Sequence, residues 1–164
     1  VWHLIMSGVF ERHPSLDFVL TEQGASWVPR TLSMLDMMAA GIRSGRMGEL
    51  GFDVEQALPR QPSEYWAQNC HVGSLIGSMT PEDRAAVGVD KIMWGSDYPH
   101  DEGCYPHTKA AMNRAFHDVD STDVAQMLSG NAARVYGFDL GALAPLAAEH
   151  GPTVAELGAS PTGS

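Results

Sequence analysis

The sequence of 164 residues is poor in cysteine and in basic side chains, and it contains no long apolar run. Its two cysteines, Cys70 and Cys104, lack the CxxC spacing, which excludes a disulfide scaffold and favours a reducing cytoplasm. Ten lysines and arginines stand against 20 aspartates and glutamates, so the basic face that nucleic acids and anionic membranes require is missing. No apolar stretch reaches transmembrane length. We therefore expect a cytoplasmic protein that binds neither nucleic acid nor membrane.

Several common catalytic motifs are also missing. No GxxxxGK[ST] or GxGxxG sequence follows a predicted strand, which argues against a P-loop and a dinucleotide-binding fingerprint. No GxSxG sequence marks a nucleophile elbow. Both cysteines are better interpreted as buried structural thiols than as nucleophiles. Nucleotide-binding and serine-hydrolase chemistries are therefore not expected.

Helical and strand patterns alternate along the chain. Short apolar runs predict strands over 16–20, 65–72 and 91–97. Apolar spacing and capping residues predict the helices, over about 1–13, 27–42, 80–88, 107–118, 121–129 and 131–136. Such alternation indicates an α/β fold with parallel strands and right-handed crossovers.

The three predicted strands make a poor parallel sheet by themselves, because such strands need cover on both faces. A segment of a larger barrel explains the pattern better than a free-standing domain. The first residues also resemble the later part of a helix whose start is not in the sequence. We assign residues 1–138 to the barrel. Residues 139–164 are rich in small residues, proline and glycine, which predicts a C-terminal extension that is partly disordered.

Polar residues follow two of the strands, where parallel barrels place their working side chains. Asp97 follows an apolar run and a Gly-Ser step, so its carboxylate would project into the barrel mouth. There it can bind a divalent cation and accept a proton from metal-bound water. The same residue could equally form a turn and cap the next helix. Glu22 ends its strand in a similar way, and a role in the pocket and a salt bridge both stay open.

The loop after Asp97 extends this polar cluster. His100 can line a substrate pocket there, whereas a solvated acidic loop is the favoured interpretation of Asp101 and Glu102. His71 lies inside a predicted strand, where a hydrogen-bonded histidine is favoured over a metal ligand. Surface roles are favoured for the other five histidines, which are His3, His13, His107, His117 and His150.

Three stretches of the chain, in order, resemble known motifs. Residues 8–22 (GVFERHPSLDFVLTE) resemble a GVFERxPxLxxVLTE passage, residues 93–100 (MWGSDYPH) a GSDYPH motif on an eighth strand, and residues 131–137 (NAARVYG) a closing NAxRxYG helix. These motifs are those of the amidohydrolase-related (amidohydrolase 2) family, the group that includes aminocarboxymuconate-semialdehyde decarboxylase. The resemblance extends over about residues 5–138.

The resemblance implies a (β/α)8 TIM barrel in which the present strands are numbers six to eight, the C-terminal half. It also implies a divalent metal, often zinc, held by an HxH pair on strand one, a histidine on strand five and the aspartate of strand eight. That aspartate matches Asp97 and doubles as the acid/base partner of the metal-bound water. The HxH pair and the strand-five histidine are absent from this sequence. The decarboxylase branch has a histidine where this chain has Glu22.

We therefore expect a metal-dependent hydrolase of a small molecule, with Asp97 as ligand and acid/base and with Glu22, Tyr98 and His100 near the substrate. One alternative is a metal-dependent decarboxylase of an unsaturated or aromatic acid. Another is a non-catalytic fragment, because a catalytic zinc normally needs three protein ligands. The full-length form is expected to be a homo-oligomer. The chain by itself is expected to be inactive and to associate through unpaired strand edges.

Overall fold

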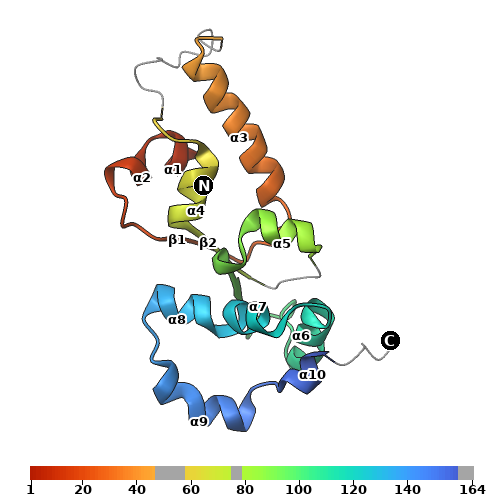
Figure 1. The fold of residues 1–164 in the computed structure, drawn as a ribbon. Helices are drawn as coiled ribbons and strands as arrows, with labels where there is room; N and C mark the ends of the chain where they lie inside the picture. Colours follow the sequence, from red (N-terminus) through yellow and green to blue (C-terminus); the bar gives the residue numbers. More distant parts are fainter. Residues whose placement is uncertain (47–57, 75–78, 159–164) are drawn as a thin grey trace. The chain divides into compact units, whose positions relative to one another are not determined.

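Three short strands form one sheet in the order β1-β2-β3: β1 (Phe18–Thr21), β2 (Cys70–Ser74) and β3 (Ile92–Trp94). In the computed structural model (Figure 1), which describes residues 1–46, 58–74 and 79–158, β2 and β3 pair in parallel with Val72 opposite Ile92. The parallel arrangement predicted from the sequence is confirmed for this pair. The chain divides into two compact units, one of residues 1–19 and 26–71, the other of residues 20–25 and 72–164.

The first unit is mainly helical. Its helices are α1 (Trp2–Met6), α2 (Val9–Arg12), α3 (Val28–Arg43) and α4 (Pro62–Asn69). The single helix predicted over 1–13 is interrupted at Gly8, which has φ +71°, a conformation that glycine adopts without a steric penalty. The core of this unit is apolar and aromatic: the fully or almost fully buried side chains include Ile5, Phe10, Val28, Leu35, Tyr65 and Trp66.

Helix α4 takes the place of the strand that we predicted over 65–72 as far as Asn69, so the prediction was wrong for 65–69 and is confirmed for 70–72, which belong to β2. Pro62 occupies the first turn of the helix, where its missing N–H costs nothing. The backbone N–H of Gln61 donates to the carboxylate of Glu64 at 2.7 Å, which satisfies a donor at the helix start. The chain becomes extended only at Cys70. Local capping chemistry therefore outweighs the apolar run that indicated a strand.

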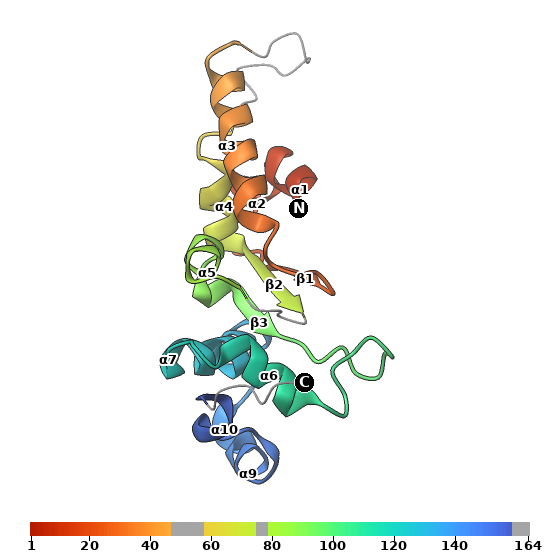
Figure 2. The same cartoon turned by 90° about the vertical axis from the view of Figure 1, so that its right-hand side faces the viewer.

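The second unit contains β3 and the helices around it. They are α5 (Pro81–Val87), the 3-10 helix η3 (Val89–Lys91), α6 (Thr108–Phe116), α7 (Ser121–Ala125), the π-helix η4 (Gln126–Gly130), α8 (Asn131–Tyr136), α9 (Leu140–His150) and α10 (Val154–Gly158). Thr80 caps α5 by accepting the backbone N–H of Asp83 at 3.1 Å, as its sequence predicts. Figure 2 shows a long loop that leaves β3 and returns to α6.

Two buried asparagines fix the chain just before β1 and at the start of β3. In the second unit the side-chain amide of Asn131, 1% exposed, donates to the carbonyls of Val89 and Ile92, both at 2.7 Å. In the first unit Asn69, also 1% exposed, donates to the carbonyls of Pro14 at 3.0 Å and Leu16 at 2.8 Å. These bonds hold the amino ends of the two strands.

The C-terminal extension is helical through residue 158. Helix α9 buries none of its side chains, whereas α10 packs on α6 through Leu157. Asn113 on α6 donates to the carbonyls of Glu156 at 2.9 Å and Leu157 at 3.0 Å, and Lys109 pairs with the Glu156 carboxylate at 3.0 Å. The disorder predicted for the last residues falls on 159–164, outside the described residues. None of the described helices is long and apolar enough to cross a membrane.

Candidate metal centre

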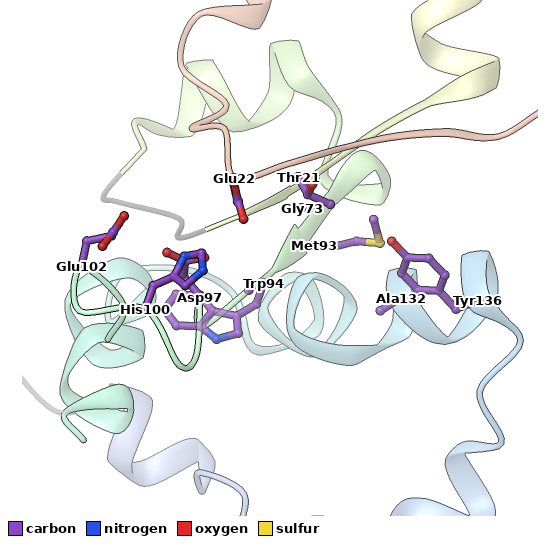
Figure 3. A pocket seen from close by; sticks show the side chains of 11 residues that line it. Thr21, Glu22, Gly73, Met93, Trp94, Asp97, His100, Glu102, Ala132 and Tyr136 are labelled. Atoms are coloured by element: carbon purple, nitrogen blue, oxygen red, sulfur yellow. The ribbon is translucent and has the colours of Figure 1, made fainter. Parts of the chain in front are cut away.

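A cavity of about 550 Å³ opens at the carboxyl ends of the strands in the second unit (Figure 3). Its lining residues come from the ends of β1, β2 and β3, from the loop after β3 and from α8. They are Thr21, Glu22, Gly73, Met93, Trp94, Gly95, Asp97, His100, Glu102, Ala132 and Tyr136. This is the end of a parallel sheet at which barrel enzymes place their chemistry.

Three potential metal ligands converge in this cavity. Glu22, Asp97 and His100 each offer a donor atom, and the three atoms lie within 4.8 Å of one another. The Nδ1 atom of His100 lies 3.4 Å from Oδ1 of Asp97, and Figure 3 shows Glu22 directed toward this pair. Two carboxylates and one imidazole are a donor set that suits zinc, manganese or iron. The residues present therefore fit a divalent cation.

Both carboxylate residues adopt an unusual backbone conformation. Glu22 has φ +56° and Asp97 has φ +59°, in the left-handed region that residues with a side chain seldom occupy. Each such residue costs on the order of 1–2 kcal/mol. Strain of this kind persists where the surroundings impose it, and it clusters at functional sites. The side chain of Asp97 is also partly shielded, with 18% of its surface exposed.

The loop after β3 is closed by hydrogen bonds within its own backbone. The N–H of His100 donates to the carbonyl of Asp97 at 2.9 Å, and the N–H of Gly103 donates to the carbonyl of His100 at 3.0 Å. At the base of the loop the N–H of Cys104 donates to the carbonyl of Ser96 at 3.0 Å. Asp97 and His100 are therefore carried by one closed turn of chain.

The structure brings together three of the four predicted site residues. Glu22, Asp97 and His100 line the cavity, whereas Tyr98 is not among the lining residues. The Tyr98 ring is 67% exposed and packs edge-on against Tyr105, with ring centroids 5.2 Å apart. Glu102, which the sequence favoured as a solvated residue, is exposed and also lines the cavity.

His71 is not among the residues that form this cluster. It belongs to the first unit, is 1% exposed, and its Nε2 atom lies 3.2 Å from Oδ1 of Asp17. This is the hydrogen-bonded state favoured from the sequence.

Sequence reasoning missed the aromatic part of the cavity wall. Trp94 is the last residue of β3 and its ring packs on Phe116 at 5.8 Å between centroids, while Tyr136 comes from the NAxRxYG helix. The signal was present, since Trp94 directly precedes the Gly-Ser-Asp step. No lysine or arginine is among the described residues that line the cavity. Its charged wall therefore consists of carboxylates and one histidine.

Comparisons with known proteins identify the family of the chain. A family model described as amidohydrolase matches residues 3–138. Among 18 matching chains of solved structures is the crystal structure of an amidohydrolase from Mycobacterium avium subsp. paratuberculosis K-10, with 30% sequence identity and a TM-score of 0.61. The match covers 84% of this chain and 32% of that one, so the present chain spans about a third of that relative. A search of curated proteins gave no match.

Proposed function

The chain belongs to the amidohydrolase family, and we propose that it forms strands six to eight of a metal-dependent hydrolase with a (β/α)8 barrel. One observation carries the proposal: Glu22, Asp97 and His100 converge in a cavity at the carboxyl ends of the strands. Two of these residues have backbone conformations in the left-handed region, a kind of outlier that is enriched at functional sites.

Asp97 is the central residue of the proposed site. Its carboxylate would hold the cation, and Glu22 and His100 offer two further donor atoms within 4.8 Å, beside any ligands that the other strands of the barrel would supply. The cation, when bound, polarises the substrate and makes water a stronger nucleophile at neutral pH. A carboxylate oxygen of Asp97 takes the proton from the attacking water. The Nδ1 atom of His100 lies 3.4 Å from Oδ1 of that carboxylate.

Charge in the cavity favours hydrolysis over decarboxylation. The described lining residues offer Glu22, Asp97 and Glu102 and no basic side chain other than His100. The acid substrate of a decarboxylase would bring another carboxylate next to these acidic side chains, and the bound cation would have to offset their repulsion. A neutral amide or ester meets no such repulsion, and the rings of Trp94 and Tyr136 provide an apolar wall. We therefore propose a neutral small-molecule substrate.

The test is an Asp97→Asn substitution in the full-length protein. Asparagine tolerates the left-handed conformation, so the fold should be retained, while turnover of a panel of amides and esters is abolished and the bound metal falls below one equivalent by mass spectrometry. Asp101→Asn is the matched control, because Asp101 lies in the same loop, is exposed and does not line the cavity. Unchanged turnover and metal content in the Asp97 variant would show that Asp97 is not a ligand.

A further inference from the structure

The loop after β3 must place two ligands accurately, although little packs against it. Asp97 and His100 are three residues apart, and the His100 side chain is 53% exposed. Functional groups at a metal site need positions defined to roughly 0.5 Å. The described contacts that hold this loop are mainly the hydrogen bonds of its own backbone, from His100 to Asp97, from Gly103 to His100 and from Cys104 to Ser96. The positions of the ligands therefore depend on how the loop closes at Gly103 and Cys104.

Gly103 is the residue around which the loop closes. A Cβ atom at this position would lie 2.9 Å from the carbonyl oxygens of Asp97 and His100 and 3.0 Å from that of Ser96. These are distances at which an atom in the neighbourhood must move. All three neighbours are backbone atoms, so no flexible side chain can move aside.

We propose that Gly103 is a positioning residue for the metal ligands Asp97 and His100. This inference rests on the proposed metal site. Because position 103 has no side chain, the three carbonyls can close around it, and this closure sets the curvature that brings the His100 ring to 3.4 Å from the Asp97 carboxylate.

A side chain at position 103 would displace Asp97 and His100 but not Glu22. A methyl group would push the carbonyls of Asp97 and His100 outward by several tenths of an ångström, and Asp97, already at φ +59°, has little room to absorb the change. Glu22 follows a different strand and is not displaced. Two ligands would therefore shift relative to the third, which distorts the coordination geometry without removing a donor.

The experiment uses Co²⁺ as the probe in the full-length protein, since its visible absorption reports coordination geometry. Gly103→Ala should weaken Co²⁺ binding by about tenfold or more, the loss seen when residues that orient ligands are changed, and should alter the absorption band. Gly24→Ala is the control, because Gly24 follows Glu22 in the other loop and no atom lies within 4 Å of its added Cβ. That variant should bind Co²⁺ as the wild type does.

The outcomes separate this inference from the proposed function. If the wild type binds no Co²⁺, the metal site itself is refuted. If the wild type binds Co²⁺ and Gly103→Ala gives the same affinity and the same spectrum, the metal site stands and the role of Gly103 is refuted. A lower unfolding temperature with an unchanged spectrum would mark a purely structural glycine and would also overturn the inference.

A second measurement needs no substitution. The amides of Gly103 and Cys104 donate the bonds that close the loop, so in the wild-type protein they should exchange slowly with solvent and more slowly after Zn²⁺ is added. Exchange as fast as in an unstructured peptide, with and without Zn²⁺, would overturn the inference even if Gly103→Ala does not fold.

Discussion

The two ends of β1 and β3 are built in opposite ways. Toward the amino ends, buried asparagines donate pairs of hydrogen bonds to the backbone: Asn69 to Pro14 and Leu16, and Asn131 to Val89 and Ile92. At the carboxyl ends, the chain continues into acidic residues with positive φ, and the side chains face a cavity.

Under the proposed function, the amino ends of the strands serve stability and the carboxyl ends serve chemistry, the division that barrel enzymes show. A buried amide that donates two hydrogen bonds to the backbone fixes the chain at that point. A carboxylate on a strained residue costs stability and leaves its oxygens open to a ligand. Substitutions at the two ends should therefore have effects of different kinds.

The largest expected effect follows from Asn131→Leu. The substitution keeps the volume but removes the buried side-chain bond to the carbonyl of Ile92 and one of the two bonds to the carbonyl of Val89, which keeps the backbone N–H of Ile92. The free energy of unfolding should fall by about 2–3 kcal/mol. Urea denaturation of the full-length protein measures the loss. Ser129→Ala removes an exposed bond to the Ala125 carbonyl and should cost less than about 0.5 kcal/mol. Similar losses for the two variants would contradict a specific role for Asn131.

Asn69→Leu should have a smaller effect than Asn131→Leu. The carbonyl of Pro14 also accepts from Gln68 at 2.9 Å, and the bond to the carbonyl of Leu16 is only partly buried, whereas the bond from Asn131 to the carbonyl of Ile92 is buried. We expect a loss of about 1–2 kcal/mol by urea denaturation. Combining Asn69→Leu with Gln68→Leu should increase the loss beyond the sum of the two single changes, because the Pro14 carbonyl then has neither donor. Strict additivity would show that Gln68 does not substitute for Asn69.

A substitution at the carboxyl end of β1 should lower metal affinity without lowering the free energy of unfolding. Asparagine adopts the left-handed conformation more readily than glutamate, so Glu22→Asn should leave the free energy of unfolding unchanged or raise it by up to about 1 kcal/mol. Zn²⁺ affinity, measured by calorimetric titration of the same protein, should fall because a carboxylate donor is lost. A destabilised variant with full Zn²⁺ affinity would mean that Glu22 supports the fold and not the site.

The sequence indicated the polar residues at the carboxyl ends of the strands, but not the asparagines that hold their amino ends. Asp97, Glu22 and His100 were recognisable because each follows an apolar run or lies in the loop after one, and the predicted helices correspond closely to α3, α5, α6 and α8. The roles of Asn69 and Asn131 could not be predicted, because their partners lie 39 to 55 residues away in the chain. Tyr98 could not be placed for a similar reason. Its orientation depends on Tyr105 and on how the whole loop closes.

The smallest expected effect is a loss of stability of α10, in the C-terminal extension, at acidic pH. The pKa of Glu156 is lowered from 4.5 to about 2, first by the backbone N–H of Thr153 and then by Lys109 and the Thr153 hydroxyl. Because the folded pKa lies below the ordinary value, this carboxylate stabilises α10 above pH 4.5, and the contribution is lost as the pH falls from 4.5 toward 2.

Hydrogen exchange of the Leu157 amide, which donates to the Thr153 carbonyl at 3.2 Å, should therefore accelerate over this pH range relative to an unstructured peptide. Glu156→Gln should remove most of that pH dependence. The amide side chains of Asn69 and Asn131 carry no titrating charge, so protection at the amino ends of β1 and β3 should persist at a pH where α10 has already detached. Loss of protection at all three places together would mean that the extension and the strands unfold as one unit, and that the division between stable and functional ends does not reach the C-terminal helices.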